Sequence, residues 1–250
     1  MKKVSPKQYA LYKSQAQQNI ADKVEDIMYD IAVDIAKQVK NYRVGNGKLF
    51  SELEFANKAE SMALDYASQI NEYIRLYSLA SASILGDKEV DKIMDTLSGE
   101  IFGKTINERT TLYLKQYATD ILNLVRASIK LGFDNNQVLE TIRKNYKDPY
   151  VATAIKDANI PIPHYGTGMM RSAFGNMNRH AQGIINFIWG KENIDYATEN
   201  GATGFYVHRG SSYPCATCDD EVGWLHKMDD PFPPYHPSCV CYVEFVYNKD

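Results

Sequence analysis

All four cysteines of this chain lie between Cys215 and Cys241, and the first 214 of its 250 residues contain none. With one histidine they form the pattern Cys215-x-x-Cys218, seventeen residues, His236-x-x-Cys239-x-Cys241. A C-x-x-C turn brings two thiolates within reach of one cation, and a C-x-C pair on a strand directs both side chains to one face. In a reducing cytosol such a cluster more often binds a metal ion than forms disulfides. The spacing therefore predicts a metal site near the end of the chain.

Zinc is the ion that fits this donor set best, because Zn²⁺ prefers four nitrogen or sulfur ligands in a tetrahedron and closed sites of this kind are structural. Five candidates exist for four positions. Cys215, Cys218 and Cys239 are the firmest choices, whereas Cys241 and His236 compete for the last position. The expected cofactor is therefore a structural zinc ion.

The loop between the cysteine pairs contains too little apolar sequence to hold itself together, as residues 219–224 illustrate. A metal or disulfide clasp would supply the missing stability. Zinc is favoured over disulfides, which are the main alternative. His226 also lies in this loop and is a substitute ligand with poorer spacing.

Catalytic motifs fit this chain less well. Pro214-Cys215-x-x-Cys218 matches half of the zinc deaminase signature, but the H-x-E motif whose Glu moves the proton is missing upstream. A thioredoxin-type motif would open a helix in a βαβ setting, whereas acidic residues and Gly223 follow here. No P-loop, H-E-x-x-H or G-x-S-x-G sequence is present.

The first 200 residues are mostly helical in pattern, because apolar side chains recur every three or four positions. This periodicity predicts helices over about 20–39, 53–77, 90–97 and 114–129, and a last helix over about 168–190. Residues 159–166 contain two prolines and are expected to form a linker.

Several residues predict where helices begin and end. Turns or stops are expected at 45–47, near Gly86, at Gly99 and at Gly132. Thr105 with Glu108 forms a capping-box pattern, and Asp134 with Gln137 suits the start of a further short helix that ends before Pro149; these pairs define the beginnings of two helices.

The character of the sequence changes after Ala202. Residues 205–207 read as a strand, and residues 239–247 alternate in the manner of a second strand. We therefore expect an α+β fold, with a helical arm or bundle over 1–160 and a small helix-plus-strand module, clasped by the Cys/His site, over 161–250.

Charge and hydropathy limit the partners. The net charge is −3 and the isoelectric point is near 6.0, so a basic surface that wraps nucleic acid is not expected. No secretory signal and no stretch long enough for a membrane span is evident, so a cytosolic origin is the default expectation.

The cysteine region resembles the phage Mu protein F-like family of minor head, or head morphogenesis, proteins. The resemblance is carried by Cys215-x-x-Cys218, by Gly223, and by the Pro-Pro-Tyr-His-Pro-Ser-Cys-Val-Cys segment at 233–241. Its coverage is about 105–247, and only the last part is specific. The family often has Arg where this chain has Val240, and Arg-Thr-Glu where it has Arg-Ser-Ala at 171–173, so the chain looks like a divergent member.

This resemblance implies a non-enzymatic virion protein, made in the host bacterial cytoplasm and present in a few copies per particle. It implies portal or capsid proteins as partners, contact with packaged DNA as a further possibility, and a role in head assembly or DNA delivery. Two alternatives stay open. A zinc-dependent enzyme acting on nucleic acid would have three protein ligands and a water beside an acid such as Glu221. A DNA-binding regulatory zinc module would show salt-dependent binding, and the acidic isoelectric point speaks mildly against it.

Overall fold

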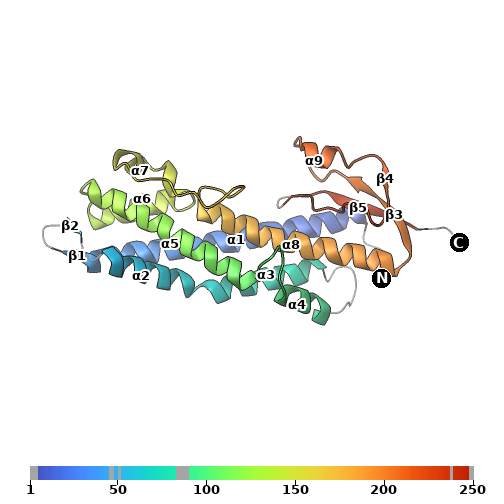
Figure 1. The fold of residues 1–250 in the computed structure, drawn as a ribbon, viewed down its shortest axis with the longest axis horizontal. Coiled ribbons are helices and arrows are strands. Elements are labelled where there is room, and N and C mark those ends of the chain that lie inside the picture. The colour runs from blue at the N-terminus through green and yellow to red at the C-terminus, as the bar shows by residue number, and fades with distance from the viewer. Residues whose placement is uncertain (1–4, 45–47, 50–51, 83–89, 237–238, 248–250) are drawn as a thin grey trace. The chain divides into compact units, whose positions relative to one another are not determined.

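The structure is a computed structural model that describes residues 5–44, 48–49, 52–82, 90–236 and 239–247. It confirms the expected α+β class, with helices over most of the chain and a small sheet late in it (Figure 1). The α-helices are α1 (Pro6–Gln38), α2 (Glu52–Leu64), α3 (Ala67–Ala82), α4 (Val90–Ser98), α5 (Ile106–Lys130), α6 (Asn135–Asn145), α7 (Thr153–Asp157), α8 (Ala173–Glu199) and α9 (Ala216–Asp219). Short 3-10 helices span Val39–Tyr42 and Pro149–Val151. The strands are β1 (Arg43–Val44), β2 (Lys48–Leu49), β3 (Ala202–His208), β4 (Leu225–His226) and β5 (Tyr242–Tyr247).

The chain divides into two compact units, each assembled from separate segments. Unit 1 comprises residues 1–21, 73–105 and 179–250, and unit 2 comprises residues 22–72 and 106–178. Three of the four boundaries between them fall within α1, α3 and α8, and the fourth lies directly before α5. The division into 1–160 and 161–250 follows sequence character and stays a prediction.

Unit 2 is centred on α5, whose buried side chains include Leu114, Ile121 and Val125. Tyr117 is fully buried, and its hydroxyl donates a hydrogen bond to the carbonyl of Met28 at 2.9 Å. A buried hydroxyl needs such a partner, because an unpaired one would carry a desolvation cost of roughly 1–3 kcal/mol. The core of this unit is thus mainly apolar, and the buried hydroxyl of Tyr117 is paired inside it.

The predicted ends of α5 and the start of α6 are confirmed. Helix α5 begins directly after Thr105 and ends before Gly132, which has φ +82°, as a C′ glycine requires. Asp134 caps α6 by accepting hydrogen bonds from two backbone amides, and the Gln137 side chain accepts from the Asp134 amide at 2.8 Å. The stops expected at 45–47 and near Gly86 lie outside the described residues.

Three predicted helices have other bounds in the structure. The helix expected over 20–39 begins at Pro6, because the first turns of α1 bury small or polar side chains such as Ala10, Lys13 and Ala16 instead of a large apolar stripe. The run expected over 53–77 is two helices, α2 and α3, because the amide of Tyr66 bonds back to the carbonyl of Ala63 at 3.3 Å and interrupts the α-helical pattern. The last helix was expected over 168–190, but α8 spans Ala173–Glu199. Its start is set by the carboxylate of Asp120, which accepts from the Ala173 amide at 2.7 Å.

The sheet of unit 1 is antiparallel and has the order β4-β3-β5. Phe205 in β3 lies opposite His226 in β4 and Phe245 in β5, and all three side chains face the inner side of the module. The expected strand at 239–247 pairs only from Tyr242 onward, where it meets His208. Strand β4 was not predicted, because two residues in a polar loop carry no alternation to detect.

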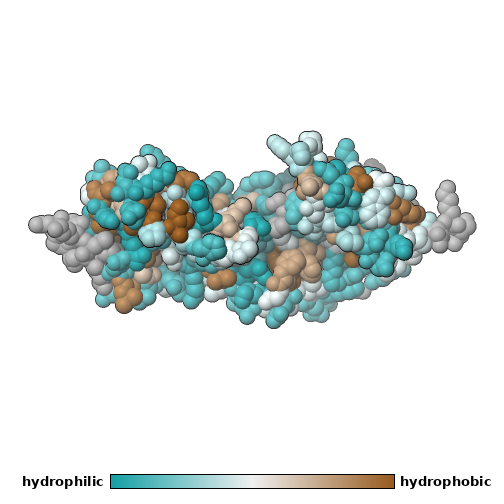
Figure 2. All heavy atoms as spheres, turned by 45° about the horizontal axis from the view of Figure 1, so that its top comes forward, coloured by the Kyte–Doolittle hydropathy of each residue, from teal (hydrophilic) through white to brown (hydrophobic). Residues whose placement is uncertain are grey.

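The face drawn in Figure 2 is mostly hydrophilic, with hydrophobic side chains in scattered patches. Exposed large apolar side chains include Tyr213 and Leu225 in unit 1 and Leu53 in unit 2. Isolated apolar residues of this kind are ordinary on protein surfaces. No helix in the described part of the chain combines the length and the apolar character that a membrane crossing requires.

Candidate metal centre

The first cysteine pair lies on a single helical turn. Cys215 is the N-cap of α9, and its carbonyl accepts hydrogen bonds from the amides of Cys218 at 3.0 Å and Asp219 at 2.8 Å. The sequence predicted only a turn here, and the structure closes that turn as a short helix. Both thiols therefore leave the same compact piece of backbone.

Arg209 holds this turn from outside. Its guanidinium donates to the carboxylate of Asp219 and to the carbonyls of Tyr213 and Cys215. The second oxygen of Asp219 accepts from the Cys215 amide at 3.1 Å. A charge-assisted network of this kind orients the donor pair before any ion binds. No sequence pattern predicted this network, because Arg209 lies before the cysteine motif and is not part of it.

The second donor segment follows two prolines that pack against α8. Gly190 permits this approach, because a Cβ at that position would lie 2.9 Å from Cδ of Pro234 and 3.0 Å from the carbonyl oxygen of Pro233. Beyond the prolines, the amide of Cys239 donates to the carbonyl of His236 at 2.9 Å. The proline segment and this turn together fix where the imidazole and the third thiol can reach.

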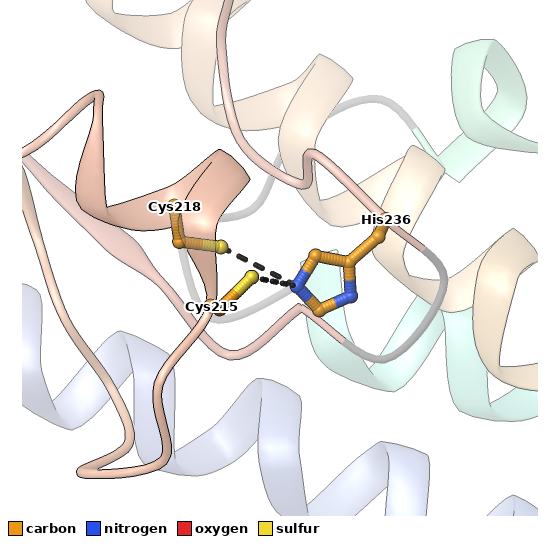
Figure 3. Close-up of side chains that lie close together, drawn as sticks. All are labelled: Cys215, Cys218 and His236. Atoms are coloured by element: carbon orange, nitrogen blue, oxygen red, sulfur yellow. Dashed lines mark hydrogen bonds between the residues drawn. The ribbon is translucent and has the colours of Figure 1, made fainter.

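Both thiols of the first pair lie on one side of the His236 imidazole and face its Nε2 atom (Figure 3). Its Nε2 atom is 3.5 Å from Sγ of Cys215 and 3.3 Å from Sγ of Cys218. Sγ of Cys218 is also 3.9 Å from Sγ of Cys239. Two segments, residues 215–218 and 236–239, thus direct their donor atoms toward one another.

All five predicted ligands are brought together, in two groups that share Cys218. Within each group the donor atoms lie within 4.8 Å of one another; the first group is Cys215, Cys218 and His236, and the second is Cys218, Cys239 and Cys241. Among the described residues these are the groups of such donors close enough to hold a metal ion. Cys218, Cys239 and Cys241 are buried, while Cys215 and His236 are partly exposed.

The substitute ligand His226 belongs to neither group. It is fully buried in β4 and stacks on Phe205 with ring centroids 4.8 Å apart. Its Nε2 lies 2.7 Å from the backbone carbonyl oxygen of Glu221. The structure therefore places His226 in the apolar core of the module, as a stacked and hydrogen-bonded side chain.

The measured distances agree with the edges of a tetrahedral site. Zn–S bonds of about 2.3 Å and Zn–N bonds of about 2.0–2.1 Å give S···S edges of about 3.8 Å and S···N edges of about 3.6 Å. The Cys218–Cys239 separation of 3.9 Å fits the first edge. The separations of 3.5 and 3.3 Å from His236 to Cys215 and Cys218 fit the second. These three separations match tetrahedral edges, whereas the donors as a whole form two groups that share Cys218 and do not all lie within 4.8 Å of one another.

The thiols differ in how readily they ionise. A hydrogen bond from Cys241 lowers the pKa of Cys239 to about 5, and the nearby charge of Lys13 acts in the same direction. Burial raises the pKa of Cys218 to about 12, and the hydrogen bond with Cys239 raises the pKa of Cys241 further still. Because thiolates are the ligand form, Cys239 is prepared for an ion, whereas Cys218 must release a proton on binding one.

A buried lysine from the other end of the chain lies beside these thiols. Lys13 of α1 is fully buried, and its Nζ donates to the carbonyls of Cys239 at 3.2 Å and Cys241 at 3.0 Å. The same atom lies 4.3 Å from the ring centroid of Trp189, a cation–π distance. Burial lowers the pKa of Lys13 to about 8, although the negative charges of the cysteines oppose that shift.

All four cysteines are free. The Cys218–Cys239 separation of 3.9 Å is much longer than a disulfide bond of about 2.05 Å. The disulfide alternative therefore finds no support in this arrangement.

Comparisons of the chain with family models, with curated proteins and with solved structures found no match.

Proposed function

We propose that this protein is a non-enzymatic minor head component of a tailed phage, with a C-terminal module fixed by a structural zinc ion. The observation that carries the proposal is the gathering of five sulfur and nitrogen donors into two adjacent groups that share Cys218. The motif that resembles the Mu protein F-like family supplies all five of them.

Zinc is the ion we assign, with Cys215, Cys218, His236 and Cys239 as its ligands. The three short distances that match tetrahedral edges all join members of this set. Cys241 then serves beside the ion, where its thiol donates a hydrogen bond to Cys239. Such outer partners orient ligands and tune their basicity.

A structural role suits this donor set better than a catalytic one. Catalytic zinc sites keep one position for water or substrate, whereas here donors outnumber the four positions. Glu221, the acid that an enzyme would need as a proton acceptor, has its carboxylate 3.8 Å from Nδ1 of the buried His226. The module is therefore better suited to display a rigid surface than to activate a water molecule.

The proposed partners are portal or capsid proteins, with packaged DNA as a further contact, and the proposed location is the virion. The net charge of −3 supports protein partners over a protein that wraps DNA. In this proposal the long helices provide surfaces that dock to these partners, and the zinc-bound module provides a rigid region of the protein.

Metal analysis of freshly purified protein tests the zinc centre. We expect one zinc per chain and four free thiols under denaturing conditions. Cobalt substitution adds the ligand count, because four-coordinate and five-coordinate Co²⁺ have different visible spectra. A chain without metal and with two disulfides would overturn the zinc centre. A five-coordinate spectrum, with zinc-dependent cleavage of nucleic acid, would support the enzyme alternative instead.

The virion role needs a separate test. Quantitative mass spectrometry of purified particles should find a few copies of the protein per particle, beside the portal protein. A replication protein of the same phage serves as the control for carry-over. Pull-down with the purified portal protein tests direct contact. Absence from purified particles would defeat the assembly role, whatever the metal content.

A further inference from the structure

Lys13 has an environment that a helix surface lysine does not normally have. Its side chain is fully buried, and its Nζ is shared between the carbonyls of Cys239 and Cys241 and the face of Trp189. Lysine is almost never fully buried unless it is paired. No carboxylate partner of Lys13 is found among the described ion pairs, so the cysteine segment is what compensates its charge.

The proposed zinc centre has the complementary excess of charge. One Zn²⁺ with three thiolates and a neutral imidazole carries a net charge of −1. A buried net charge is costly unless an opposite charge lies close to it. Lys13 carries one positive charge and interacts electrostatically with Cys239, Cys241 and Cys218. The ammonium and the zinc–thiolate centre together are neutral.

Lys13 also fixes the backbone that presents Cys239. The two carbonyls that Lys13 binds are on either side of Val240, so the C-x-C segment faces α1. Its pairing with β3 begins only at Tyr242, after the second of these cysteines. The contact spans 226 residues of sequence to Cys239 and 228 to Cys241. A single side chain thus links the first turns of α1 with the ligand segment.

We propose that Lys13 is the internal counter-ion and positioning residue of the metal centre, and that it couples zinc binding to the docking of the first turns of α1. This inference rests on the proposed zinc centre. Coupling of this kind is reciprocal: if zinc tightens the docking of α1, the docked helix tightens zinc by the same factor. In this proposal the N-terminal segment therefore supports a metal centre whose ligands all lie beyond residue 214.

Zinc affinity of the full-length chain, measured by competition with a chromophoric chelator, tests the counter-ion role. Lys13→Met keeps much of the side-chain volume and removes the charge, so we expect binding to weaken by about 10-fold to 100-fold, as for other residues that support metal ligands. Lys7→Met is the matched control, because Lys7 is an exposed lysine of the same helix. It should bind zinc like the wild type.

Hydrogen exchange tests the coupling without any variant. Removal of zinc from the wild type should speed amide exchange over residues 10–20 of α1 and leave residues 113–129 of α5 unchanged. In Lys13→Met, zinc should protect residues 10–20 much less.

The outcomes separate the two proposals. Equal zinc affinity of the Lys13 and Lys7 variants, or exchange in α1 that ignores zinc in the wild type, would overturn the role of Lys13 and leave the zinc centre standing. A wild-type chain that binds no zinc would overturn both. Should Lys13→Met not fold, the exchange measurement on the wild type decides.

Discussion

Asp120 in unit 2 and Lys13 in unit 1 are buried charged side chains that are compensated in different ways. In unit 2, the carboxylate of Asp120 accepts hydrogen bonds from the hydroxyls of Tyr150, at 2.6 Å, and Tyr165, and from the Ala173 amide. In unit 1, Lys13 faces the backbone carbonyls of Cys239 and Cys241, beside the cysteine side chains of the candidate metal centre. Unit 2 thus satisfies its buried charge from the chain itself, whereas unit 1 is completed, in our proposal, by an ion from outside.

The two units should therefore lose their folded structure for different reasons. Apolar burial around α5 needs no ligand, and its stability depends on packing. The module around β3 has a small core in which three of the buried residues are cysteines. Both tryptophans, Trp189 and Trp224, lie in unit 1, so their fluorescence reports on that unit alone.

The largest expected effect comes from removing a ligand. Cys239→Ser should reduce zinc from one per chain to none and should unfold the module, since structural zinc contributes on the order of 10 kcal/mol in small zinc-dependent folds. Tryptophan fluorescence in urea should lose its cooperative transition, while amide exchange in α5 stays slow. Thr217→Ala, at an exposed position between the first two cysteines, is the control and should keep its zinc. Full zinc content in Cys239→Ser would remove Cys239 from the ligand set.

The next largest effect is expected from a substitution that creates a cavity in the core of unit 2. Ile121 is fully buried, and Ile121→Ala should lower the free energy of unfolding by about 2–5 kcal/mol. Circular dichroism in urea measures the loss, and zinc affinity should not change. Leu112→Ala, in the same helix but 39% exposed, should cost far less. A parallel loss of zinc affinity in Ile121→Ala would show that the two regions are not independent.

The stability of unit 2 should also depend on pH, through the buried carboxyl group of Asp120. Burial raises the pKa of Asp120 from 3.8 to about 6, although its hydrogen bonds act to lower it. The folded state therefore holds the proton more tightly, and this group's contribution is full below pH 4 and is lost as pH rises through 6, by up to about 3 kcal/mol. The stability difference between wild type and Asp120→Asn should shrink by that amount from pH 4 to pH 7. A constant difference in urea unfolding across this range would contradict the raised pKa.

The sequence predicted these regions unequally, for physical reasons. Helices were found where apolar periodicity is local, and the capping box at Asp134 and Gln137 was found because both partners lie within one turn. The five candidate ligands that the structure brings together were identified because their spacing is itself the signal. Features that depend on distant partners were missed.

Two features show what distance hides. Helix α8 starts at Ala173 because Asp120, on another helix, accepts from its amide, and no local pattern carries that information. Lys13 looks like any helix-surface lysine until the chain folds its cysteine segment against it. The sequence pattern predicts the helices, the strands and the candidate metal ligands. The side chains that orient them, such as Asp120 and Lys13, can be identified only from the tertiary structure.

The smallest expected effect tests how closely the proline segment must approach α8. Gly190 and Gly183 are both interior glycines of α8 in unit 1, but only Gly190 faces a neighbour: a Cβ there would lie 2.9 Å from Pro234, whereas nothing lies within 4 Å of one at Gly183. Gly183→Ala should therefore stabilise unit 1 by about 0.5–1 kcal/mol, through helix propensity alone.

Gly190→Ala gains the same propensity but pushes the prolines away, and overpacking of this kind costs about 1–3 kcal/mol. Because His236 follows those prolines, the displacement should also weaken zinc binding, which stability alone would not do. Tryptophan fluorescence in urea and chelator competition measure the two effects. If both variants gain stability and bind zinc equally well, the proline segment has room to relax, and the position of His236 is set by the ion and not by the packing against α8.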